Sequence, residues 1–91
     1  IKLENGNTIN NFDIYPNPSR DIFNISFNSD KIQNITIKIS NIIGAEVYSE
    51  LKTSFIGEYI KQINLENFEK GIYILEIKSE NDIINKKIIL Q

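Results

Sequence analysis

The side chains best suited to catalysis are missing from this 91-residue chain. It contains no histidine and no cysteine, which removes the commonest general base, the commonest metal ligand and the thiolate nucleophile. A serine or threonine nucleophile would need a lysine as its base, and no motif pairs them. The residue types therefore argue against nucleophilic catalysis, and disulfides are impossible.

Carboxylates and amides supply the remaining candidates for chemistry. Glu66 and Glu69 could be drawn as an acid–base pair. The stretches Asn28–Asp30 and Glu80–Asp82 carry oxygens that could bind calcium. Because these stretches separate runs of alternating apolar residues, we interpret their Asn, Asp and Ser residues as turn formers. The sequence thus predicts no enzyme, no cofactor and no metal site.

Composition and charge are those of an ordinary folded domain. Hydrophobic residues make up 41% of the chain and charged residues 24%, and the net charge is −2. Acidic and basic residues are mixed, so no basic patch points to nucleic acid. No apolar run approaches the roughly 18 residues of a membrane span. We expect one globular domain whose partner is neither nucleic acid nor the membrane interior.

Alternating apolar and polar residues predict that short β-strands form this domain. Seven segments carry the pattern: residues 12–15, 21–28, 35–40, 46–51, 58–65, 71–78 and 83–90. Turn-forming residues separate them, with Asn28–Asp30 interpreted as a turn and Lys52–Gly57 as a loop. No helix is expected. The pattern predicts an all-β fold, an immunoglobulin-like antiparallel β-sandwich of about seven strands.

The alternation also predicts which faces are buried. Ile35, Ile37 and Ile39 give the clearest period-2 signal and should form the middle of the core. Their predicted neighbours are Phe23, Ile25, Phe27, Leu75 and Ile77. The last strand leaves two registers open, with either Ile84, Ile88 and Leu90 or Ile83 and Ile89 facing inward.

Tyr73 lies at the start of the strand Gly71–Lys78, two residues before the core position Leu75. That spacing is typical of a tyrosine corner, in which the hydroxyl bonds backbone a few residues upstream. We expect Tyr73 to be buried and bonded to backbone within Leu65–Lys70. Pro16 and Pro18 follow the first strand and cannot donate backbone hydrogen bonds, so that strand should lie at a sheet edge.

Four short motifs occur in a distinctive order. They are Tyr15-Pro16-Asn17-Pro18, a mid-chain turn with Gly44, Gly71-Ile72-Tyr73, and the terminal Lys86-Lys87-Ile88-Ile89-Leu90. In this order the chain resembles the type A C-terminal sorting domain of the type IX (Por) secretion system of Gram-negative bacteria. The resemblance covers Phe12–Gln91. Residues 1–11, polar and rich in asparagine, are then expected to be a linker from a preceding cargo domain.

The resemblance implies a non-catalytic sorting signal. Such domains direct a cargo protein from the periplasm across the outer membrane, and a sortase-like surface peptidase then removes them. The cargo is released or joined to an anionic lipopolysaccharide, and is therefore secreted or held at the cell surface. The implied partners are the type IX machinery, that peptidase and the N-terminal cargo domain. Cleavage is expected within Ile1–Asn11. The candidate recognition residues within the four motifs are Tyr15, Pro16, Asn17, Pro18, Gly44, Gly71, Tyr73, Lys86, Lys87, Ile88, Ile89 and Leu90.

A permanent immunoglobulin-like spacer or adhesion module of a multidomain surface protein is the alternative function. A spacer would be followed by more chain, so the closeness of Gln91 to the last motif favours sorting. If the domain is a sorting signal, edge strands at the two chain ends are the expected places for a receptor to add a strand.

Overall fold

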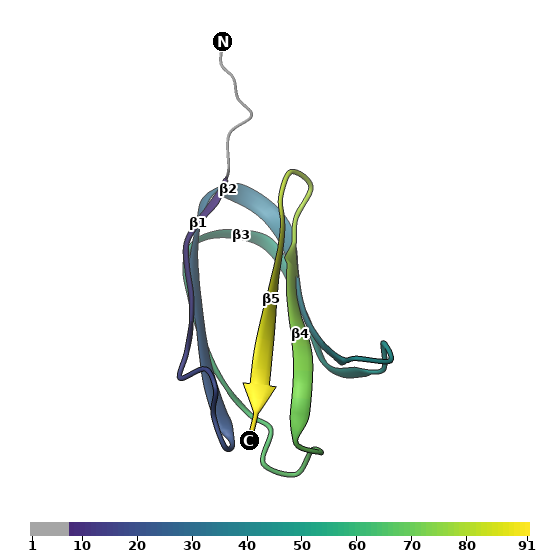
Figure 1. Ribbon diagram of the computed structural model, residues 1–91. Coiled ribbons are helices and arrows are strands. Elements are labelled where there is room, and N and C mark those ends of the chain that lie inside the picture. The colour runs from purple at the N-terminus through teal and green to yellow at the C-terminus, as the bar shows by residue number, and fades with distance from the viewer. Residues whose placement is uncertain (1–7) are drawn as a thin grey trace.

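The computed structural model describes residues 8–91, which form five antiparallel β-strands (Figure 1). They are β1 (Ile9–Tyr15), β2 (Ile22–Asn41), β3 (Glu46–Asn64), β4 (Gly71–Lys78) and β5 (Ile83–Leu90). β1 includes residues 9–11 of the segment that we expected to be a linker. Among the described residues, no helix is long and apolar enough to cross a membrane.

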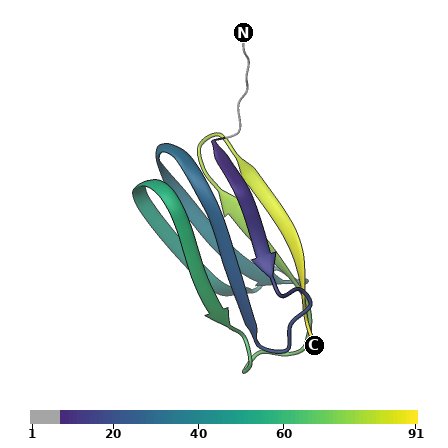
Figure 2. The same ribbon diagram turned by 90° about the vertical axis from the view of Figure 1, so that its left-hand side faces the viewer.

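The sheet folds over on itself because β2 and β3 are long and bent. Residues 22–29 of β2 pair with β1 on one side and with residues 57–64 of β3 on the other. Residues 35–41 of β2 pair with residues 46–52 of β3 and with β4, which in turn pairs with β5. The two halves face each other as two layers in Figures 1 and 2. The all-β antiparallel sandwich is therefore confirmed, with β1 and β5 at the ends of the strand order β1-β2-β4-β5.

The predicted number of strands was wrong: residues 8–91 form five, not about seven. The stretch Asn28–Asp30 is not a turn between two strands but the start of the bend in β2, where the pairing register shifts between Ser29 and Gln33. Lys52–Gly57 is likewise not a loop but part of β3, bent where Ser54 and Gly57 adopt φ values of 49° and 98°. Both bends are irregularities of the β-bulge kind, which add twist without ending the ladder.

The core lies between the two layers. The side chains of Ile35, Ile37 and Ile39 are fully buried, as predicted. So are their expected neighbours Phe23, Ile25, Phe27, Leu75 and Ile77.

The register of the last strand is settled by the same core. In β5, Ile88 and Leu90 are buried and Ile84 is half-buried, so Ile83 and Ile89 face outward. Ile63 in the second half of β3 is buried.

A polar cluster lies at the side of the sandwich that β3 forms. Tyr48 and Tyr59, from the two halves of β3, both donate hydroxyl hydrogen bonds to Glu50 Oε1. Burial and the bond to Glu50 raise the pKa of Tyr59. Desolvation alone would raise the pKa of Glu50, but the two hydroxyl donors and nearby lysines lower it overall. Glu50 is therefore a charged acceptor that ties one layer to the other.

Candidate recognition site

The four motifs converge on one end of the sandwich, although in sequence they are spread over residues 15–90. Tyr73 pairs with both Asn41, at the turn that contains Gly44, and Ile88 on β5. Ser19, just beyond the proline motif, forms a parallel bridge with Leu90. In Figure 1 the loop after β1, the segment before β4 and the C-terminus lie at the same end of the molecule.

Asn17 joins the proline motif to the terminal motif. The backbone N–H of Ile89 donates to Asn17 Oδ1 at 3.0 Å, and Asn17 Nδ2 donates to the carbonyl of Lys87 at 3.1 Å. Ser19 continues the contact, since its N–H donates to the Ile89 carbonyl and its own carbonyl accepts from the N–H of Gln91. The segment 17–19 thus occupies the place of a neighbouring strand beside the last residues of β5.

This contact changes what the C-terminal strand can offer to a receptor. Backbone groups of residues 87–91 that we expected to be available for strand addition already have partners in segment 17–19. The free edge of β5 is therefore confined to its first half.

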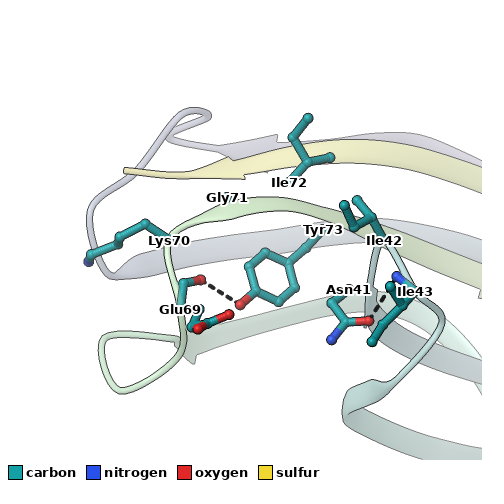
Figure 3. A pocket seen from close by; sticks show the side chains of 8 residues that line it. All are labelled: Asn41, Ile42, Ile43, Glu69, Lys70, Gly71, Ile72 and Tyr73. Atoms are coloured by element: carbon teal, nitrogen blue, oxygen red, sulfur yellow. Dashed lines mark hydrogen bonds between the residues drawn. The ribbon is translucent and has the colours of Figure 1, made fainter.

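Tyr73 forms the expected corner. Its side chain is only 4% exposed, and its hydroxyl donates to the carbonyl of Glu69 at 2.5 Å (Figure 3). The prediction of a tyrosine corner on Leu65–Lys70 is confirmed. Gly71, between these two residues, has φ 145°. The corner fixes the backbone that leads into β4, and with it the position of Ile72, which points away from Tyr73 in Figure 3.

The mid-chain turn is held by Asn41. Its Oδ1 accepts the N–H groups of Ile43 and Ala45, and Gly44 between them adopts φ 91°, a conformation that L side chains rarely take. The turn leaves Ile42 and Ile43 largely in solvent, with Ile43 85% exposed. A hollow of about 300 Å³ separates this turn from the corner at residues 69–73 (Figure 3).

The motif side chains divide into packing and surface groups. Ile88 and Leu90 belong to the core, together with Tyr73. The remaining members lie at the surface: Tyr15, Pro16, Asn17, Pro18, Lys86, Lys87 and Ile89. The peptide bonds before both prolines are cis. Ile89 lies directly opposite Ile72 on the outer face of the sheet, and both are partly exposed.

Asp82 makes a connection that the sequence did not reveal. One oxygen, Oδ2, accepts from the N–H groups of Thr8 and Ile9 and from the Thr8 hydroxyl, at 2.5–3.1 Å. The start of β1 is thereby fastened to the turn before β5, at the opposite end from the motifs. Asp82 was one of the calcium candidates, and these bonds give it a structural role. Within residues 8–91, no group of three acidic side chains is placed to hold a metal ion.

Comparison with known proteins gives a family for this arrangement. Residues 13–91 match the family described as the secretion system C-terminal sorting domain. An endo-acting ulvan lyase of Formosa agariphila is 29% identical over 79 residues, which is 86% of this chain and 14% of that enzyme. An ulvan lyase of Nonlabens ulvanivorans is 36% identical over 78 residues, which is 85% of this chain and again 14% of the enzyme.

The shared region is thus a small part of each lyase and nearly all of this chain. The family match covers every strand except the first residues of β1, and it includes all four motifs. The chain belongs to the family of type IX secretion system C-terminal sorting domains, and its function is that of a sorting signal.

Proposed function

We propose that this domain carries an N-terminal cargo protein through the periplasm and across the outer membrane by engaging the type IX machinery, and that it performs no catalytic step itself. The observation that supports this proposal most strongly is the convergence of the four motifs, which are distant in sequence, on one end of the fold. A signal that serves a cargo much larger than itself must present its recognition groups on its own fold. One end built from four separate segments meets that need.

The recognition surface in this proposal combines the exposed members of the motifs. The Gly44 turn presents Ile42 and Ile43, β4 presents Ile72, and β5 presents Ile89 beside it. Exposed apolar side chains gathered at one place are typical of protein interaction sites. The buried members Tyr73, Ile88 and Leu90 hold this surface in place.

Removal of the domain after export would occur N-terminal to Thr8. From Thr8 onward the backbone is engaged, because Asp82 accepts the N–H groups of Thr8 and Ile9 and Thr8 accepts from Asp30. A peptidase needs an extended backbone that is free of such bonds. The sortase-like surface peptidase is its proposed partner, and the exported cargo is secreted or held at the cell surface.

A reporter fusion tests this function. The 91-residue chain is joined to the C-terminus of a reporter that is delivered to the periplasm, in cells with and without the type IX machinery. The reporter should reach the medium or cell surface only where the machinery is present. Retention in the periplasm of both strains would instead favour the permanent spacer.

A further inference from the structure

We infer that the first half of β5 is a docking edge for an extended, acidic segment of a partner protein, which binds by adding a strand. The inference rests on the proposed function, because the partner belongs to the machinery that recognises the domain. Beyond the proposed function, the inference specifies strand addition as the binding mode, the residues of β5 that take part, and the negative charge of the partner segment.

The direction of the backbone groups in β5 follows from the contacts of Asn17. Lys87 O and Ile89 N face Asn17, away from β4, so the N–H and C=O groups of residues 83 and 85 face the same way in the alternating ladder. Among the described residues, no hydrogen bond reaches the outward groups of Ile83 and Asn85 or the N–H of Lys87. The free edge therefore runs over residues 83–87 and stops where Asn17 begins.

A hollow lies next to this edge of β5. β1 lies in the opposite layer from β5 (Figure 1). Hydrogen bonds join segments that flank the two strands, Thr8 to Asp82 at one end and Ser19 to residues 89–91 at the other. Between those two connections lies a hollow of about 220 Å³, lined by Phe12–Ile14, Asn17 and Lys86. A side chain from an added strand could enter there.

The charge of the edge favours an acidic partner. Lys86 lines the hollow together with Asp13, and Lys87 is exposed on the outer face of the sheet. Neither ammonium group lies within 4 Å of a carboxylate in residues 8–91. The ion pair that those residues do form joins Lys38 to Glu76. Successive side chains of a strand point to opposite faces, so an added strand with acidic residues at adjacent positions could meet both lysines.

Two proline substitutions provide the matched test. Asn85→Pro removes an outward N–H from the proposed edge, whereas Gln62→Pro removes one from the outer edge of β3. Leu65 N donates to Asp21 O, which places the N–H of residue 62 on the side away from β2 by the same alternation. Proline is tolerated at such outward edge positions, and a thermal melt checks that both variants fold.

In the reporter assay, Asn85→Pro should lower the exported fraction by about tenfold, the effect on affinity of losing one or two hydrogen bonds. Gln62→Pro should export like the unsubstituted chain. Equal export by both variants, or equal loss while both are folded, would overturn the docking edge and leave the sorting function standing. If the unsubstituted fusion is not exported, the proposed function fails and the docking edge fails with it.

A charge-reversal pair decides the question if Asn85→Pro does not fold. Lys87→Glu should reduce export, whereas Lys31→Glu, at the bend of β2, should not; equal export by the two would contradict the acidic partner. The size of the purified domain must also be measured by sedimentation. A dimer that Asn85→Pro abolishes would assign the edge to a second copy of the chain and overturn the inference.

Discussion

The contact between Asn17 and the last strand can be tested by removing the side chain of Asn17. Asn17→Ala deletes two hydrogen bonds, one from Ile89 N–H and one to Lys87 O. Each such bond contributes about 0.5–1.5 kcal/mol net. Since both lie at the surface and water can replace them, we expect the total loss to be near the lower end, about 1–2 kcal/mol.

Urea denaturation measures this loss directly. A domain of this size should show a lower midpoint with an unchanged m-value, and a fall in Tm of roughly 4–8 °C per kcal/mol. Asn85→Ala is the matched control, because Asn85 lies on β5 itself, is exposed and makes no side-chain hydrogen bond to the described residues. Its effect should stay within about 0.5 kcal/mol.

Hydrogen exchange locates the effect. In the unsubstituted domain, the amide of Ile89 should be protected by Asn17, and in Asn17→Ala it should exchange much faster. The amides of residues 88 and 90, which face β4, should change far less. An unchanged stability together with an unchanged rate at Ile89 would refute the strand-like role of segment 17–19.

Three further substitutions test the core, the corner and the polar cluster. Ile37→Ala removes a fully buried side chain and should cost about 2–5 kcal/mol in urea denaturation; less than about 1 kcal/mol would mean that this face is not packed. Tyr73→Phe strands the carbonyl of Glu69 and should lower the free energy of unfolding by about 1 kcal/mol. If Tyr73 and Leu65 act independently, Tyr73→Phe should cost the same amount in a domain that also carries a substitution of Leu65. The folded-state pKa of Glu50 lies below its ordinary value of 4.5, so its stabilising effect is present above that pH and is lost on acidification. The stability difference between the unsubstituted domain and Glu50→Gln should therefore shrink as the pH falls below about 4.5, and a pH-independent difference would contradict a charged Glu50.

The core and the corner were predictable because both depend on local spacing. Alternation places Ile35, Ile37 and Ile39 on one face wherever the strand lies, and the two-residue interval from Tyr73 to Leu75 sets the corner. The number of strands was not predictable in this way. Bulges and turns use the same residue types, so Asn28–Asp30 gave the signal of a chain reversal where β2 only bends.

The contacts that bring the four motifs together could not be predicted from the local sequence pattern either. Asn17 meets Lys87 and Ile89 across about 70 positions of sequence, and nothing in either segment specifies the partner. The same holds for Asp82 and Thr8 at the opposite end. The motif order predicted which segments take part in sorting, and this stays a prediction. Only the folded chain showed that they adjoin, and that segment 17–19 already covers part of the edge we expected to be free.

The central claim is that the machinery recognises the end of the sandwich where the four motifs meet. Export of a reporter carrying Ile43→Asp, compared with Ile32→Asp, tests it most directly. Both side chains are exposed, at 85% and 64%, and neither belongs to the core, so both variants should melt like the unsubstituted domain. Ile43 lies in the Gly44 turn, whereas Ile32 lies in the bend of β2. Ile43→Asp should leave the reporter in the periplasm, while Ile32→Asp should be exported normally. Normal export of Ile43→Asp, or loss of export with Ile32→Asp alone, would contradict the central claim.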